Sequence, residues 1–229
     1  MPIVSLSTTH PRFPDPCSAE TAPDGLLAVG GNLNPNTLLT AYQSGIFPWY
    51  QDGDPLLWWS PSVRCLLDPR DIHISQSLRK AMRRGGYVVT TNCAFEQVLL
   101  GCSAERDAQS PGTWITEEMR AAYADLHRCG CAHSVEMWRN GDLVGGLYGV
   151  AVGGMFCGES MFSRETNSSK IALVTLSQKL VKAQFSLIDC QLPTPHLLSL
   201  GAIPIARKAF LDRLQHQVNR DLSWPIFDD

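Results

Sequence analysis

Apolar positions recur every three or four residues in several stretches of the chain, the spacing that places them on one face of a helix. The clearest stretch follows Asn34, a suitable N-cap residue, and Pro35, and it ends at Gly45. A second follows Ser75 and stops at two glycines. The helices that this pattern predicts are residues 34–45, 75–84, 95–99, 116–130, 168–180, 196–200 and 207–218.

Between these helices lie runs rich in β-branched and aromatic residues, which predict strands. Asn140-Gly141 is a strong hairpin signal between two of them. The order of a helix, three antiparallel strands, a helix and a further strand predicts an α+β fold. Residues 1–62, which contain nine prolines, are expected to be loop-rich. The predicted strands are residues 87–91, 134–138, 143–150, 155–162 and 185–192.

Composition narrows the class of protein. Hydrophobic residues make up 44% of the 229 residues and charged residues 18%, which excludes a disordered chain because such chains are charge-rich and apolar-poor. The net charge of −3 argues against a globally basic nucleic-acid coat. There is no signal-peptide pattern, and no run approaches the ~20 apolar residues of a membrane span. We therefore expect a soluble, cytoplasmic protein that does not associate with membranes.

One local basic cluster stands out against this slightly acidic background. Arg79, Lys80, Arg83 and Arg84 fall within six residues of the second predicted helix, with no acidic residue among them. Like charges at this spacing repel one another. Such a cluster is usually a solvated face, but the missing acids favour a patch that binds phosphates.

Several kinds of site find no support in the sequence. The eight cysteines are expected to stay reduced in a non-secreted chain. His127, Cys129, Cys131 and His133 alternate, and on a strand they would line up ~7 Å apart, too far to close around one metal ion. Nucleotide-binding glycine motifs and hydrolase nucleophile motifs are absent. We expect neither a metal nor a cofactor.

Polar residues embedded in apolar strands are the main candidates for chemistry. Glu159 lies within Phe156–Phe162, and Asp189 and Gln191 lie within Leu187–Leu192. Their spacing of two predicts that Asp189 and Gln191 share one face of a strand. A buried carboxylate is costly unless it is paired or hydrogen-bonded, so each residue alone fits a structural network as well as an active site. Three of them in two neighbouring strands favour a site.

Seven short segments carry motifs that are specific in combination and cover nearly the whole chain. They are residues 25–31 (GLLAVGG), 45–49 (GIFPW), 58–61 (WWSP), 112–116 (GTWIT), 145–150 (GGLYGV), 156–163 (FCGESMFS) and 187–191 (LIDCQ). Together these segments resemble the leucyl/phenylalanyl-tRNA–protein transferase family. The resemblance implies a small N-terminal domain over residues 1–62 and an acetyltransferase-like (GNAT) mixed-sheet domain over residues 63–229.

The resemblance also implies an activity. Such an enzyme moves Leu or Phe from aminoacyl-tRNA to the N-terminal amine of an acceptor protein that begins with Lys or Arg, which marks the acceptor for degradation in the N-degron pathway. The ester on the tRNA is already activated, so the absence of an ATP motif fits. Acyl transfer to an amine requires a deprotonated amine, its orientation, and stabilisation of a tetrahedral oxyanion. The family further implies a monomer.

The resemblance assigns the catalytic roles to three residues. Asp189 would hydrogen-bond to the attacking amine and deprotonate or orient it. Gln191 would donate its amide to the ester carbonyl or hold the nucleophile. Glu159 would add negative potential that favours a cationic acceptor terminus. His196, in a proline-rich stretch, is given no role.

The resemblance also assigns the binding surfaces. Trp49 and Trp114 would stack on the 3′-terminal adenosine or lie beside it, and the basic cluster would contact phosphates of the acceptor stem. For each apolar wall residue alone, core packing is the safer interpretation, and the pocket rests on the family resemblance. The implied walls of the amino-acid pocket are Leu147, Phe156, Leu173, Leu176, Leu180 and Ile188.

Two other functions remain as alternatives. An acyl-CoA-dependent acyltransferase of the same fold would need a glycine-rich turn before the helix at residues 168–180, but residues 164–168 contain no glycine. Saturable binding of acetyl-CoA would favour that function. A non-catalytic tRNA-binding module would explain the basic cluster but not Glu159, Asp189 and Gln191.

Overall fold

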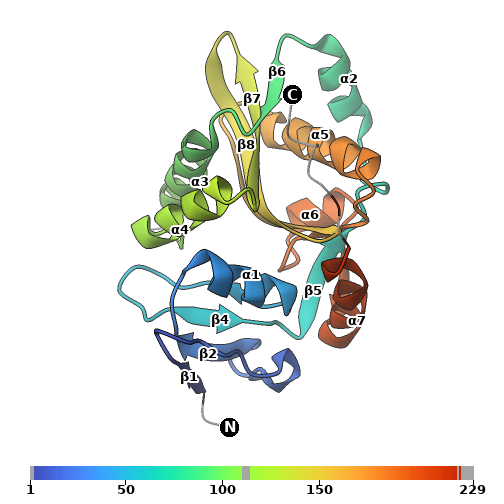
Figure 1. Cartoon of the computed structure of the whole chain (residues 1–229). Helices are drawn as coiled ribbons and strands as arrows, with labels where there is room; N and C mark the ends of the chain where they lie inside the picture. The colour runs from blue at the N-terminus through green and yellow to red at the C-terminus, as the bar shows by residue number, and fades with distance from the viewer. Residues whose placement is uncertain (1–2, 110–113, 221, 223–229) are drawn as a thin grey trace.

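The computed structural model describes residues 3–109, 114–220 and 222 of the chain, without the side chains of residues 105–109. These residues form two sheets with helices packed around them (Figure 1). The expected α+β class is confirmed. Within these ranges no helix is both long enough and apolar enough to cross a membrane.

The N-terminal segment forms the smaller sheet, in the spatial order β1-β2-β4-β3. β1 (Val4–Leu6) runs parallel to β2 (Leu26–Gly30), and β4 (Leu57–Trp59) pairs antiparallel with both β2 and β3 (Phe47–Pro48). Helix α1 (Pro35–Gln43) connects β2 to β3, and a short 3-10 helix, residues 16–18, precedes β2. The sequence predicts a loop-rich segment here, whereas the structure contains four strands. The strands are not visible in the sequence pattern because each has only two to five residues and prolines interrupt the segment.

The larger sheet has seven strands and mixed direction. β10 runs parallel to β9, and the other neighbours pair antiparallel. In spatial order the strands are β11 (Ile203–Ala206), β5 (Val63–Leu67), β10 (Leu187–Asp189), β9 (Met155–Ser163), β8 (Asp142–Val152), β7 (Ala132–Arg139) and β6 (Val88–Thr91).

Helices cover both faces of this sheet. α3 (Phe95–Gln109) and α4 (Glu117–Arg128) lie on one face, and α5 (Ser168–Lys182) lies on the other (Figure 1). α2 (Gln76–Arg84) packs against α5. The two remaining helices are α6 (Pro195–Ser199), between β10 and β11, and α7 (Arg207–Val218), after β11.

Local signals placed the helices well. Ser75 and Thr116 cap α2 and α4, accepting hydrogen bonds from the backbone N–H groups of Leu78 and Met119. The Asn34 side chain makes no such bond, although α1 begins at Pro35 as predicted. α3 extends well beyond the predicted residues 95–99.

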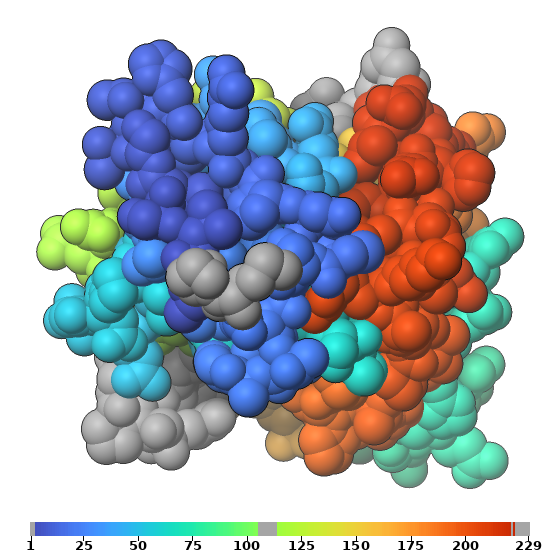
Figure 2. All heavy atoms as spheres, turned by 90° about the horizontal axis from the view of Figure 1, so that it is seen from below, coloured from blue at the N-terminus to red at the C-terminus, as the bar shows by residue number. Residues whose placement is uncertain are grey.

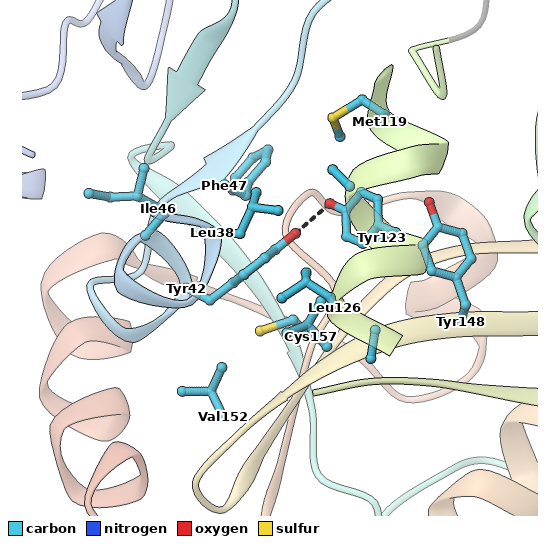
Figure 3. Close-up of a cluster of buried hydrophobic side chains, with 14 of the residues drawn as sticks. Leu38, Tyr42, Ile46, Phe47, Met119, Tyr123, Leu126, Tyr148, Val152 and Cys157 are labelled. Atoms are coloured by element: carbon cyan, nitrogen blue, oxygen red, sulfur yellow. Dashed lines mark hydrogen bonds between the residues drawn. The ribbon is translucent and has the colours of Figure 1, made fainter. Parts of the chain in front are cut away.

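One hydrophobic core joins the two sheets. Leu38, Tyr42 and Ile46, from α1 and the turn after it, pack with Tyr123 and Leu126 of α4 (Figure 3). The N-terminal segment and α7 also lie side by side on one face of the molecule (Figure 2). The smaller sheet is therefore a fixed part of the surroundings of any site on the larger one.

Gly45 shows how closely α7 approaches the end of α1. Its φ of +75° is in the left-handed region that favours glycine. A Cβ atom at this position would lie 2.7 Å from a methyl carbon of Leu211 on α7 and 2.9 Å from the ring of Phe210. A side chain here would force α7 away.

Candidate active site

A cavity of about 310 Å³ lies where the two sheets meet. Its walls come from the residues around β3, from Trp114, and from β8, β9 and α5. Ile188 of β10, the segment after β10, and His196 and Leu197 of α6 complete the lining. Apolar and aromatic side chains dominate the lining, as in most sites that hold a small organic group.

Most of the predicted wall residues line this cavity. They are Leu147, Phe156, Leu173, Leu176 and Ile188. Leu180 does not line it: this residue lies one helical turn beyond Leu176 on α5 and is completely buried in the core. One face of α5 therefore lines the cavity at Leu173 and Leu176 and packs into the core at Leu180.

Both predicted tryptophans line the cavity as well. Trp49 keeps 41% of its surface exposed, and its ring meets that of Trp59 edge-on with centroids 5.6 Å apart. The Trp59 indole N–H donates to the Trp49 carbonyl oxygen at 2.6 Å. Trp114 follows Gly112 and Thr113, two motif residues that lie outside the described part of the chain. Two partly exposed indoles thus border an apolar cavity.

The polar groups of interest in the lining are Glu159 and Gln191. The Gln191 Nε2 atom donates to Glu159 Oε1 at 3.2 Å, and the Tyr123 hydroxyl donates to Glu159 Oε2 at 2.7 Å. In the described residues no hydrogen bond engages Gln191 Oε1. A carboxylate and an amide are therefore held together at the cavity wall, with the amide oxygen available to a bound group.

The environment of Glu159 perturbs its acidity. Burial raises the pKa of Glu159 to about 7, and the nearby Asp189 charge acts in the same direction. The hydrogen bond from Tyr123, the nearby Tyr42 hydroxyl and the positive charge of Arg64 oppose the rise. A carboxyl group with a pKa near neutrality can both accept and return a proton at physiological pH.

Asp189, the third predicted catalytic residue, does not line the cavity. Its side chain is completely buried and forms a two-pronged ion pair with Arg64: Arg64 Nε donates to Oδ1 at 2.8 Å, and a terminal nitrogen donates to Oδ2 at 2.6 Å. The ring centroids of Phe47 and Phe210 lie 4.7 and 4.5 Å from the Arg64 guanidinium carbon. The remaining guanidinium nitrogen donates to the Gly45 carbonyl oxygen at 3.2 Å.

Gln191 and Asp189 do not share one face of a strand, contrary to the expectation from their spacing. Strand β10 ends at Asp189, and Gln191 has a φ of +54°, which breaks the alternation of side chains. The backbone N–H of Gln191 donates to Asp189 Oδ1 at 3.0 Å. Asp189 thus holds the turn that directs the Gln191 side chain into the cavity.

The basic cluster forms an exposed surface of α2, outside the cavity lining. Its members are Arg79, Lys80, Arg83 and Arg84. In the ranges that the structure covers, none of the four forms an ion pair with an acidic side chain. Leu78 anchors the helix beneath them. The cluster therefore presents uncompensated positive charge to solvent.

Sequence reasoning missed three residues of this site. Arg64 lies next to the apolar run Cys65–Leu67, which is the same signal that singled out Asp189. Tyr42 and Tyr123 lie on the apolar faces of two predicted helices, where the sequence pattern does not distinguish them from core residues. In the described part of the chain no group of three or more His, Cys, Asp or Glu side chains could hold a metal ion.

Comparison with known proteins gives a consistent result. A family model described as Leucyl/phenylalanyl-tRNA protein transferase matches residues 66–215, and one described as its N-terminal domain matches residues 31–62. A leucyl/phenylalanyl-tRNA–protein transferase of Hahella chejuensis is 52% identical, over 98% of this chain and 96% of its own length. One of Stutzerimonas stutzeri is 54% identical, over 91% and 92%.

Among solved structures, a GCN5-related N-acetyltransferase from Kribbella flavida is similar with a TM-score of 0.42 and 11% identity, covering 72% of this chain and 58% of its own. This likeness is too weak to bear on function. The two matching family models and the relatives above 50% identity decide the matter. The chain belongs to the leucyl/phenylalanyl-tRNA–protein transferase family.

Proposed function

We propose that this protein transfers Leu or Phe from aminoacyl-tRNA to the N-terminal amine of proteins that begin with Lys or Arg. Membership of the family makes it an aminoacyltransferase that uses aminoacyl-tRNA and a protein acceptor. The observation that carries the finer proposal is the apolar cavity with Glu159 and Gln191 at its wall. It offers an apolar slot for the side chain and polar groups for the reacting ends.

The amino-acid side chain would enter between α5 and the sheet. Leu173 and Leu176 of α5 face Phe156 and Ile188 of the sheet there, and no charged group lies among these four. Leucyl and phenylalanyl side chains, which are apolar and not branched at Cβ, gain free energy from this burial, at about 25 cal/mol per Å². The 3′-terminal adenosine would lie beside Trp49 and Trp114, where base stacking is worth ~1–3 kcal/mol.

Glu159 and Gln191 would act on the acceptor amine. Glu159 attracts the cationic acceptor terminus and takes one proton from its ammonium group. Gln191 Oε1 accepts a hydrogen bond from the amine and aims its lone pair at the ester carbonyl carbon. As the new C–N bond forms and the C–O bond to the ribose breaks, a second amine proton passes to the departing 3′ oxygen.

Asp189 would act as a positioning residue. Both of its oxygens are engaged, by Arg64 and by the Gln191 backbone, and it does not reach the cavity. Of the two roles that the resemblance allows, deprotonating or orienting, this geometry favours the second. Asp189 orients the amine indirectly, by fixing the turn that carries Gln191.

The transfer assay tests the proposed function. Purified protein is mixed with radiolabelled Leu-tRNA and a peptide that begins with Arg, in the absence of ATP. We expect label on the peptide, and much less on a matched peptide that begins with an acidic residue. If neither peptide is labelled, the proposal is contradicted. Saturable binding of acetyl-CoA to the same protein would favour the acyl-CoA alternative.

A further inference from the structure

A line of hydrogen bonds connects α1, in the N-terminal segment, with the cavity wall. Tyr42 of α1 and Tyr123 of α4 are both buried, and their hydroxyl oxygens are 2.5 Å apart (Figure 3). Tyr123 donates its hydroxyl hydrogen to Glu159, so the hydrogen between the two tyrosines comes from Tyr42. Glu159 in turn accepts from the Gln191 amide. The line therefore has one direction, from Tyr42 through Tyr123 to Glu159.

We propose that Tyr42 is a positioning residue for the transfer reaction, which acts through Tyr123 to fix the Glu159 carboxylate and the Gln191 amide bound to it. Neither tyrosine lines the cavity, so neither touches a bound group. The proposal rests on the proposed function, because it concerns the same carboxylate and amide.

Packing alone does not account for the two hydroxyl groups. The Tyr42 ring packs with Leu38 and Ile46, and the Tyr123 ring meets that of Tyr148 edge-on at 5.3 Å, contacts that phenylalanine would also make (Figure 3). A buried hydroxyl is costly unless it is hydrogen-bonded. Here Tyr42 donates to the Tyr123 hydroxyl and Tyr123 donates to Glu159, so both hydroxyls are hydrogen-bonded. The last acceptor is a carboxylate, which can accept without donating.

The charges around Glu159 support this direction of donation. Burial raises the pKa of both Tyr42 and Tyr123 well above the usual value, and Glu159 raises them further, so both hydroxyls remain protonated donors. From β10 and β5, Asp189 and Arg64 act on Glu159 with opposite signs. Cys157 of β9, whose pKa burial raises well above its usual value, stays neutral. Donation from the tyrosines favours the ionised carboxylate.

Tyr50 provides a matched control. Its hydroxyl also links the N-terminal segment to α4, at 3.4 Å from Thr116 Oγ1 and 3.3 Å from Glu118 Oε2. It is buried to a similar degree, at 7% exposed against 1% for Tyr42, but its bonds do not lead to Glu159. Tyr42→Phe and Tyr50→Phe therefore each remove one hydroxyl between the N-terminal segment and α4. Only Tyr42→Phe interrupts the hydrogen bonds that lead to Glu159.

The experiment compares the pH dependence of kcat/KM for the peptide in wild type, Tyr42→Phe, Tyr123→Phe and Tyr50→Phe. Without the hydrogen bond from Tyr42, the Tyr123 O–H group donates more weakly to Glu159 and stabilises the ionised carboxylate less. The acid limb of the pH profile should therefore move to higher pH by about 0.5 to 1 unit. Tyr123→Phe should move it further, and Tyr50→Phe should leave it in place. kcat should fall in the first two variants, with the KM for Leu-tRNA unchanged.

A second measurement needs no turnover. The titration of Glu159 is followed by carboxyl ¹³C NMR of glutamate-labelled protein, with the resonance assigned by its absence in Glu159→Gln. Its midpoint should rise in Tyr42→Phe and not in Tyr50→Phe. Equal midpoints in Tyr42→Phe and wild type would overturn the inference, whether or not the protein transfers leucine. If the midpoints shift as expected among the variants but wild type transfers no leucine, the proposed function is rejected and the inference about Tyr42 stands.

Discussion

At the scale of single residues, the Arg64–Asp189 pair decides how Gln191 is presented. Both side chains are buried, at 1% and 0% exposed, so their charges are compensated almost entirely by each other and by nearby backbone groups. A buried pair of this kind adds little net stability compared with apolar residues of the same size, but losing one partner leaves an uncompensated charge. Its presence here fits a role in positioning.

Arg64→Met tests that role. It leaves the Asp189 carboxylate buried without its cation, and we expect the free energy of unfolding to fall by about 3–5 kcal/mol in urea denaturation. Arg70→Met is the matched control, because it breaks an ion pair with Asp68 in which the Arg70 side chain is 65% exposed. We expect much less loss of stability there, because solvent screens the pair.

The double variant Arg64→Met, Asp189→Leu separates stability from function. Replacing both charges by apolar side chains should restore much of the stability lost in Arg64→Met. It should not restore transfer, because the Gln191 backbone N–H has lost its acceptor and the turn is no longer fixed. Recovery of transfer together with stability would show that Asp189 is not needed to position Gln191.

The acidity of Glu159 gives a second prediction. Glu159 ionises at about 7 in the fold, so kcat/KM for an Arg peptide should rise as the pH increases through 7. The acceptor amine also titrates, with a pKa of about 7.7–8.0, so Glu159→Gln is the necessary comparison. In that variant the limb near pH 7 should disappear and only the amine limb should remain. A wild-type limb that persists unchanged in Glu159→Gln would assign it to another group.

The same shift affects stability, with a definite sign. The unfolded chain ionises Glu159 at about 4.5 and the folded protein at about 7, so the folded state binds more protons between these values. The contribution of Glu159 to stability is therefore lost as the pH rises from 4.5 to 7. Thermal unfolding of Glu159→Gln should show a flatter dependence on pH than wild type across this window.

The sequence was sufficient to find the candidate residues but not their geometry. Glu159, Asp189 and Gln191 stood out because each is polar within an apolar run, and two of them line the cavity. The environment of Asp189 depends on Arg64, which is 125 positions away in the chain, and on a left-handed residue at Gln191. Neither long-range pairing nor a single positive φ can be derived from periodicity in one sequence.

At the scale of elements, helices were easier to predict than strands because caps and apolar faces are local. β5 and β11 were not predicted, since they are stabilised by long-range pairing: β11 pairs with β5, and β5 pairs with β10. Pro204 obscured β11, although proline is tolerated there because β11 is an edge strand. The predicted strand 185–192 is shorter in the structure because the chain leaves the extended conformation after Asp189.

Helix α2 leads to a prediction about RNA binding. If its cations contact phosphates, Arg83→Ala combined with Arg84→Ala should weaken binding of Leu-tRNA. The slope of log K against log salt should decrease by about 1 for each contact removed. Lys208→Ala with Arg213→Ala removes the same charge from exposed positions of α7 and should change the slope less. Equal changes in the two pairs would show that only net charge matters.

At the scale of the whole molecule, the cavity exists only because the two sheets share a core. Phe47, Pro48 and Trp49 come from the N-terminal segment, and the opposite walls come from β8, β9 and α5. Tyr42 and the Gly45 carbonyl oxygen connect the same segment to Glu159 and Arg64. The N-terminal segment therefore contributes to the site itself, in addition to any contact with tRNA.

The central claim is that the cavity holds the aminoacyl end of the tRNA, with its carbonyl beside Gln191. The most direct test is a crystal structure with an amide-linked leucyl-adenosine analogue. We predict the leucyl side chain between Leu176 and Ile188 and the adenine beside Trp49 or Trp114. The carbonyl carbon should lie near Gln191, with room between it and Oε1 for the acceptor amine. An analogue bound elsewhere, with Glu159 and Gln191 facing an empty cavity, would contradict the account.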